Sequence, residues 1–167
     1  MYVPFEQLPP DSRLWIYQAA RPFTEVETEV ISNALREFCG QWSAHGDPLE
    51  TSFLIKYKQF IILSVNENSI GASGCSIDGS VRVLKELSQR FNNDLFNRTN
   101  VAFSNRGEIN LYSIQELPKL FESGTLTAIS QTFDNLVPDK GAFEKRWKIE
   151  VEKTWLAKYL PKGTLSV

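Results

Sequence analysis

The sequence predicts an α+β fold, in which two helices cover one antiparallel sheet in a ferredoxin-like split β-α-β arrangement. Two segments carry apolar residues at the 3.6-residue spacing of amphipathic helices, and four shorter ones have the apolar pattern of strands. Their order along the chain is strand, helix, strand, strand, helix, strand. The 167 residues, 42% of them hydrophobic, are enough for a sizeable core.

The first strand is predicted over residues 13–18, a short and mostly apolar run after a proline-rich start. Thr24 and Glu27 form a capping box that predicts the start of the first helix, because the hydroxyl and the carboxylate can satisfy free amides there. An apolar stripe then follows at helical spacing, made of Val26, Val30, Ile31, Ala34, Leu35, Phe38 and Trp42.

Two strands are predicted over 52–57 and 60–65. The first has the pattern of a half-buried strand. In it, one face carries Phe53, Ile55 and Tyr57 and the other carries Leu54, Lys56 and Lys58. The second is a continuous apolar run typical of a central strand. Lys58-Gln59 is the predicted turn between them. If 52–65 were instead one bent strand, the alternative would be a parallel three-stranded α/β arrangement.

The second helix follows a loop of small residues at 66–76, and its apolar face ends before Asn92 and Asn93. The fourth strand is predicted at 101–103, and a turn at 105–107 connects it to its predicted partner strand at 109–112. The first four predicted strands and the two helices define a ferredoxin-like core at 11–104.

The remaining residues, 105–167, are predicted to form a smaller C-terminal appendage packed on that core. A capping box of Ser113 and Glu116 predicts a short helix that stops at Gly124. Over 140–160, helical and alternating patterns overlap. We favour a short helix at 140–146 followed by a strand, because Ile, Val and Thr disfavour a helix.

The loop 71–80 is the predicted ligand-binding segment. It joins an apolar strand to a helix, where free backbone amides carry partial positive charge and glycines allow close approach of a ligand. This pattern indicates binding of a small anionic ligand, and the candidate residues are Gly71, Ser73, Gly74, Ser76 and Asp78. The alternative interpretation is that this loop is only a connector between the strand and the helix, and that its glycines serve to allow a tight turn.

Cys75 is a candidate nucleophile because it falls in the first turn of the predicted second helix, where the helix end favours a thiolate. His45 is the single histidine and the candidate base. Topology does not favour this pairing, since we expect the N-termini of the two helices at similar ends of the sheet and His45 follows the C-terminus of the first. Cys39 is expected to pack inside the first helix.

A basic tail is the third candidate feature. Residues 140–167 contain seven Lys and Arg and three Asp and Glu, and aromatic residues alternate with the cations through 140–162. Such a segment can bind single-stranded nucleic acid through phosphate contacts and base stacking. The simpler interpretation is that the aromatics pack on the body of the protein while the lysines stay in solvent.

The composition of the sequence argues against membrane, secreted, disulfide-rich and metal-binding proteins. No apolar run approaches the length of a membrane span, and the first ten residues do not read as a signal peptide. Two cysteines predict a cytoplasmic protein with reduced thiols and no disulfide scaffold. One histidine and two distant cysteines predict no metal site, and no cofactor is expected.

Three segments carry a resemblance to a known family. They read RLWIYQA at 13–19, WSAHGDPL at 42–49 and GASGCSID at 71–78, and the likeness continues from Phe133 to Trp147. The chain resembles a family of small bacterial proteins that are often labelled "ABC transporter ATPase". The resemblance implies no catalytic residue. An ABC ATPase needs a P-loop lysine, a Walker-B acid and a signature motif, and none is present, so we do not expect ATPase activity.

The leading hypothesis is therefore a non-enzymatic module that binds a small ligand or a protein through loop 71–80 and the neighbouring His45 loop. The first alternative is a small thiol enzyme with Cys75 as nucleophile and His45 as base. The second is nucleic-acid binding through the tail at 140–162.

Overall fold

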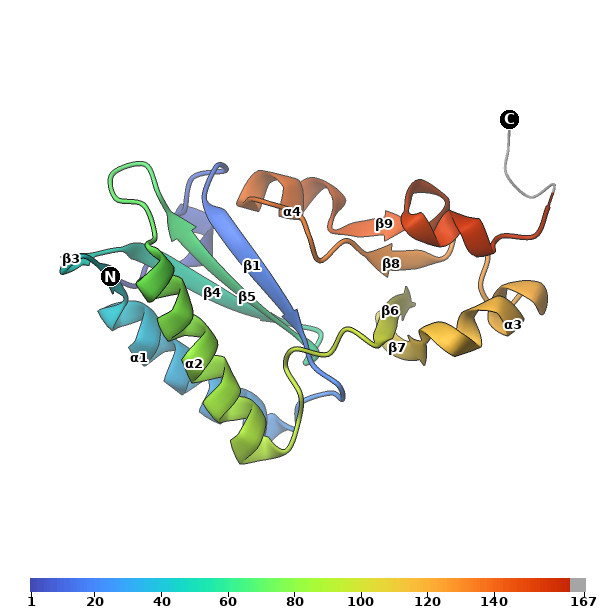
Figure 1. Ribbon diagram of the computed structural model, residues 1–167, viewed down its shortest axis with the longest axis horizontal. Helices are drawn as coiled ribbons and strands as arrows, with labels where there is room; N and C mark the ends of the chain where they lie inside the picture. Colours follow the sequence, from blue (N-terminus) through green and yellow to red (C-terminus); the bar gives the residue numbers. More distant parts are fainter. Residues whose placement is uncertain (163–167) are drawn as a thin grey trace. The chain divides into compact units, whose positions relative to one another are not determined.

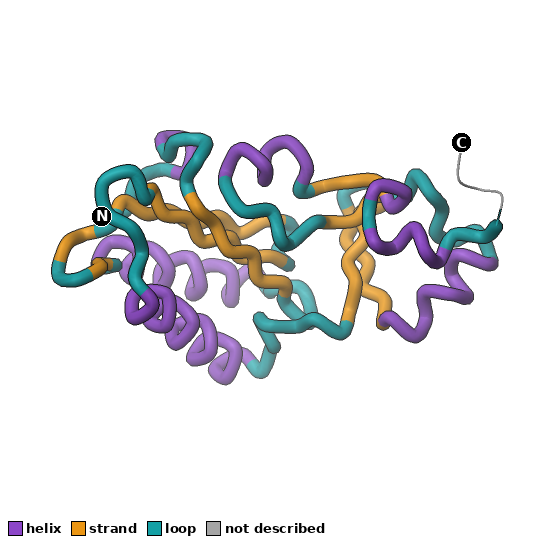
Figure 2. The backbone as a smooth tube through the Cα atoms, turned by 45° about the horizontal axis from the view of Figure 1, so that its top comes forward, coloured by secondary structure: helices purple, strands orange, loops and turns teal. Residues whose placement is uncertain are grey.

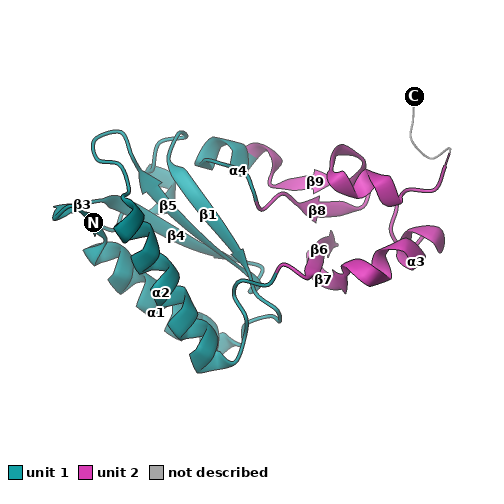
Figure 3. Cartoon of the chain, viewed as in Figure 1, with its two compact units in different colours: residues 1–97, 136–144 teal, residues 98–135, 145–167 magenta. Residues whose placement is uncertain are grey.

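A computed structural model describes residues 1–162 of the chain. The chain folds into two compact units, shown in Figure 3. Unit 1 consists of Met1–Asn97 and Leu136–Glu144, and unit 2 consists of Arg98–Asn135 and Lys145–Val167. Unit 1 is therefore built from two separate stretches of chain, whereas the sequence places a single boundary at 104/105.

Unit 1 is a three-stranded antiparallel sheet with two helices on one face (Figures 1 and 2). The sheet contains β1 (Arg13–Gln18), β4 (Glu50–Lys56) and β5 (Phe60–Asn66), in the order β1-β5-β4. The helices are α1 (Glu25–Gln41) and α2 (Gly74–Phe91). Three short elements complete the unit's first stretch: the 3-10 turn η1 (Phe5–Gln7), β2 (Ser43–Ala44) and β3 (Asp47–Pro48).

The core of unit 1 follows from the two periodicities of the sequence. The central strand β5 is buried on both faces, with Phe60, Ile61, Ile62 and Leu63 fully inaccessible, which explains its continuous apolar run. One face of the sheet packs against the apolar stripes of the helices, including Ile31, Leu35 and Cys39 of α1 and Leu84 and Leu87 of α2. The predicted capping box of Thr24 and Glu27 is present at the start of α1.

The predicted fourth strand lies elsewhere. The order β1-β5-β4 is that of a split β-α-β unit, but β6 (Asn100–Asn105) pairs with β7 (Glu108–Ser113) and β8 (Gln131–Phe133) in a second sheet. The two-residue turn at Arg106-Gly107 joins β6 directly to β7. Because the two strands are adjacent in sequence, β6 pairs with β7 in a local hairpin and not with the sheet of unit 1. The parallel alternative is wrong, because β4 and β5 form an antiparallel hairpin.

The turn between β4 and β5 also differs from the prediction. Lys56 pairs with Phe60, and the residues at positive φ are Tyr57 (+55°) and Lys58 (+52°) rather than Lys58 and Gln59. No glycine or asparagine marks these left-handed positions, so the usual sequence signal is missing.

Unit 2 contains a four-stranded antiparallel sheet in the order β7-β6-β8-β9, with β9 at Lys148–Glu150. Its helical elements are η2 (Ile114–Glu116), α3 (Leu117–Glu122), η3 (Val151–Lys153) and η4 (Trp155–Tyr159). A separate core holds this unit together. It consists of Phe103, Leu117, Phe121, Leu126, Val151 and Leu156.

The predicted helix and strand of the C-terminal segment are confirmed as α4 (Lys140–Arg146) and β9. The first five residues of α4 belong to unit 1. There the backbone amides of Lys140 and Gly141 donate to the carbonyls of Ser12 (2.9 Å) and Pro10 (2.8 Å). The chain is therefore of mixed α+β character, with all strand pairs inside its sheets antiparallel.

Candidate functional site

Two serines at the start of α2 form hydrogen bonds with the free backbone groups of the helix end. Ser73 is the N-cap, and its hydroxyl accepts a hydrogen bond from the amide of Ser76 at 3.2 Å. The hydroxyl of Ser76 donates back to the carbonyl of Ser73 at 2.8 Å, and Ser76 is buried. Both predicted ligand-binding serines thus satisfy helix-end groups, while Cys75 and Asp78 are exposed on the same turns.

A carboxylate lies inside the loop where an anion was expected to bind. Oε2 of Glu67 accepts a hydrogen bond from the amide of Ala72 at 2.8 Å. The same oxygen lies 3.4 Å from the position that a Cβ on Gly71 would take. Arg13 approaches the other oxygen of Glu67 at 3.9 Å. The protein therefore supplies its own negative group to this part of the loop.

The backbone conformation at Gly71 and Gly74 does not require glycine. Neither Gly71 nor Gly74 has a positive φ, and open space surrounds Gly74. The neighbouring loop differs, because His45 (φ +53°) and Gly46 (φ +83°) form the tight turn of the β2–β3 hairpin. This turn places His45 at an exposed hairpin tip.

Trp42 joins the hairpin to the start of α2. It is 3% exposed, follows the last residue of α1, and its indole Nε1 donates to the carbonyl of Ser76 at 2.9 Å. The ring also lies 4.9 Å from that of Phe38 and 6.0 Å from that of Trp15, between centroids. An N–H in an apolar pocket with one acceptor fixes the position of that acceptor.

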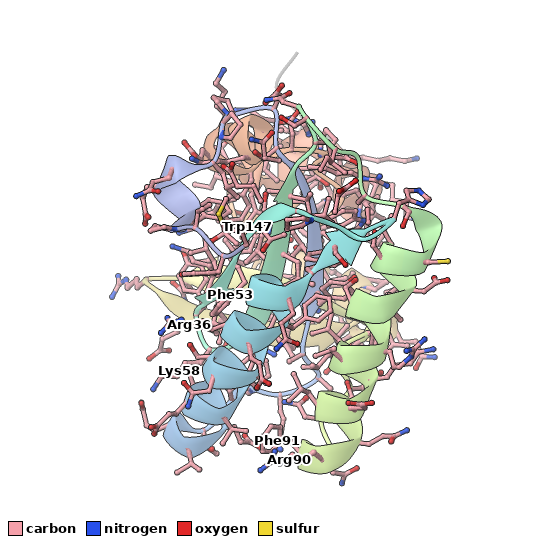
Figure 4. All side chains as sticks on the ribbon, turned by 90° about the vertical axis from the view of Figure 1, so that its left-hand side faces the viewer. Arg36, Phe53, Lys58, Arg90, Phe91 and Trp147 are labelled. Carbon is pink, nitrogen blue, oxygen red and sulfur yellow. The ribbon has the colours of Figure 1, made fainter. Side chains whose placement is uncertain are left out.

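This contact corrects the expectation that both helix N-termini lie at similar ends of the sheet. The end of α1 and the β2–β3 hairpin adjoin the beginning of α2. In Figure 4, α1 and α2 lie side by side, with Arg90 and Phe91 at the end of α2 far from the hairpin. The reason is that β5 is antiparallel to β4, so the chain returns to the end of the sheet where α1 stops.

The two cysteines have opposite environments. Cys75 is exposed, whereas Cys39 is fully buried within α1 and its backbone carbonyl accepts the hydroxyl of Thr51 at 2.8 Å. Burial raises the pKa of the Cys39 thiol to about 11, because the interior disfavours the thiolate. Any thiol chemistry on this surface therefore belongs to Cys75.

The basic tail does not form one solvent-exposed segment. Lys140 is 7% exposed, and its ammonium donates to the carbonyls of Leu8 (2.7 Å) and Glu6 (3.2 Å). Phe143 and Trp147 are buried as well. Only Trp155 among the tail's tryptophans is exposed, and the ammonium of Lys158 lies 5.3 Å from its ring centroid. The packing that the simpler interpretation expects is therefore found for Phe143 and Trp147 but not for Trp155.

Sequence reasoning missed the role of two residues at this site. Trp42 was assigned only to the apolar stripe of the first helix, and Glu67 only to a polar loop. The available signal for Trp42 was its position two residues beyond Gly40, past the expected end of the helix. No comparable signal marks Glu67, because its contact with Ala72 depends on the loop's path.

Comparison of the chain with protein-family models, with curated proteins and with solved structures finds no match. Within residues 1–162, no group of three or more His, Cys, Asp and Glu side chains is arranged to hold a metal ion. The helices of that same part lack the length and apolar character of a membrane span.

Proposed function

We propose that the protein is a non-enzymatic interaction module that binds another protein. Its recognition surface consists of residues 43–50 and 71–80, which we call the hairpin–helix surface. The observation that carries this proposal is the buried hydrogen bond from Trp42 to Ser76, because it holds the hairpin and the helix start together. A preorganised surface loses less entropy on binding than two independent loops.

Charge favours a basic protein segment over a small anion as the partner. Residues 43–50 and 71–80 contain Asp47, Glu50 and Asp78 and have no Lys or Arg. Asp47 and Asp78 are exposed, so their charges face solvent. Because opposite charges steer association and like charges penalise it, this surface suits a lysine- or arginine-bearing partner.

Photocrosslinking in the native cell tests the proposal. A photoreactive residue is placed at Asp78, and the matched control carries it at Arg90, which is exposed at the opposite end of α2. We expect a discrete crosslinked protein from position 78 alone. Its yield should fall when Asp47 is changed to Lys, since that change reverses one exposed charge of the surface. Equal products from both positions would argue against the proposal.

A second candidate function is thiol chemistry with Cys75 as nucleophile and His45 as base. It is favoured by the exposure of Cys75 in the first turn of α2 and by the attachment of the His45 hairpin to the same turn. The test is the pH dependence of alkylation, with buried Cys39 as the internal control. Rapid labelling of Cys75 near neutral pH that slows in His45→Gln supports this function. Labelling unaffected by that change removes the proposed base.

We propose that unit 1 is a ferredoxin-like layer without its fourth strand, which the antiparallel order β1-β5-β4 and the two helices support. We also propose a cytoplasmic location, which the free and exposed thiol of Cys75 supports.

A further inference from the structure

Unit 2 contains a pocket, and none of its lining residues belongs to the hairpin–helix surface. It has a volume of about 330 Å³ and lies between the β6–β7 hairpin and the loop 125–131. In the hairpin, Asn110 pairs with Phe103 and Glu108 pairs with Asn105. Side chains of paired residues lie on the same face of a sheet, so Phe103, Asn105 and Asn110 point into one concave region.

The floor of the pocket is apolar. Phe103 and Leu126 line it and are also members of the unit 2 core, with 2% and 6% exposure. The ring of Phe103 lies 5.9 Å from that of Tyr112, which lines the pocket from β7. At the rim, Ile129 is 70% exposed. A floor of this kind can pack against the C–H face of a ring.

The walls supply hydrogen-bonding groups that both donate and accept. They include the side-chain amides of Asn105, Asn110 and Gln131 and several hydroxyls. Among the described residues, neither Asn105 nor Asn110 uses its side-chain amide in an intramolecular hydrogen bond, so both are available to a ligand. Groups that donate and accept suit a ligand with several hydroxyls.

Arg106 is the one charged residue among those lining the pocket, and no carboxylate lines it. In the described part of the chain it forms no salt bridge. It occupies the first position of the β6–β7 turn at φ +52°, where Asn or Gly is favoured over a long side chain. An unpaired arginine in an unfavourable backbone conformation at a pocket rim indicates a role for its charge.

We propose that this pocket binds a small polyhydroxylated organic anion, of the class of sugar phosphates and sugar acids. The guanidinium of Arg106 pairs with the anionic group, since its fork of N–H groups matches the oxygens of phosphate and carboxylate. The amides of Asn105 and Asn110 bind hydroxyls, and the ring of the ligand covers the apolar floor. This site is independent of the proposed protein-binding surface.

Titration of the whole protein, followed by backbone amide NMR shifts, tests the proposal with four probes. These are glucose 6-phosphate, glucuronate, neutral glucose and inorganic phosphate. We expect glucose 6-phosphate or glucuronate to bind at least about tenfold more tightly than glucose and phosphate, because only they use both charge and hydroxyl contacts. The shifts should map to the β6–β7 hairpin and loop 125–131. The two anions distinguish a phosphate from a carboxylate ligand.

Arg106→Asn is the decisive variant, because Asn suits the left-handed turn and the fold is retained while the charge is lost. We expect it to weaken binding of the preferred anion at least about tenfold, and Arg106→Lys to restore part of the affinity. Arg82→Gln in α2 is the matched control and should leave affinity unchanged. The proposal is overturned if no probe binds, if glucose binds as well as its anionic derivatives, or if Arg106→Asn has no effect.

Discussion

The carboxylate of Glu27 connects the start of α1 to two other parts of unit 1. Oε1 accepts the amide of Thr24 at 2.9 Å and Nη1 of Arg21 at 2.8 Å, and Oε2 accepts Nη2 of Arg21 at 2.9 Å. Nη2 of Arg21 also donates to the carbonyl of Phe91 at the end of α2. These bonds, above all those from Arg21, lower the pKa of Glu27 to about 2. The capping box was predictable from sequence, whereas the arginine that completes it was not.

A pH-dependent loss of stability follows from this pKa. The folded value lies below the ordinary 4.5, so the contribution is complete above about pH 5 and is lost as pH falls toward 2. Arg21 is 43% exposed, and solvent screening reduces the contribution to about 1–2 kcal/mol. Glu27→Gln should therefore lower the free energy of unfolding by that amount at pH 7 and by only about a quarter of it at pH 2.5.

Urea unfolding at pH 7, 4 and 2.5 measures this difference. Glu29→Gln is the matched control, because Glu29 is exposed on the same helix. A difference between the Glu27→Gln variant and the unchanged protein that stays constant from pH 7 to 2.5 would contradict the role assigned to the carboxylate.

At the scale of elements, the sequence predicts most helices and strands because burial repeats with the period of the element. The stripe in α1 and the continuous run in β5 show this directly. The pairing of β6 with β7 was predictable from the turn between them, whereas the placement of β6 in a second sheet was not, because its apolar residues fit either sheet. The expected topology did not favour a pairing of His45 with Cys75, whereas the hydrogen bond from Trp42 to Ser76 joins the His45 hairpin to the start of α2.

The β4–β5 turn offers a test of backbone strain. Lys58 has a φ of +52°, which costs a side-chain-bearing residue about 1–2 kcal/mol. Glycine removes this cost but loses about 0.5–1 kcal/mol of chain entropy, so Lys58→Gly should raise stability by about 0.5–1 kcal/mol. Lys58 also forms an exposed ion pair with Glu25, and Glu25→Gln is therefore introduced as the background for all variants.

Lys58→Ala in that background separates the two effects, because it removes the same side chain and keeps the backbone cost. Thermal and urea unfolding should rank the variants with Gly above Lys and Ala. If the alanine variant is as stable as the glycine variant, the gain does not come from the backbone.

At the scale of the whole molecule, unit 1 is completed by residues that follow most of unit 2 in sequence. The sequence predicts a single boundary, because no change in composition indicates that residues 136–144 belong to unit 1. The structural reason is local: the carbonyl of Pro138 accepts the amide of Leu14, and α4 begins against the segment that precedes β1. The buried Lys140 holds this return together with the apolar side chains of Val137 and Phe143, and the ring of Phe143 lies 5.9 Å from that of Phe5.

Lys140 provides the test of that arrangement. Its side chain is 9% exposed, and its ammonium satisfies the carbonyls of Leu8 and Glu6 while lying 5.3 Å from the ring centroid of Phe5. Lys140→Met keeps the apolar stem and leaves both carbonyls without this donor, which should cost about 1–3 kcal/mol. Hydrogen exchange should accelerate in β1 and β5 of unit 1, although the changed residue lies far along the chain. Lys145→Met, an exposed position of the same helix, should have little effect, and equal acceleration in both variants would show that Lys140 does not hold the two stretches of unit 1 together.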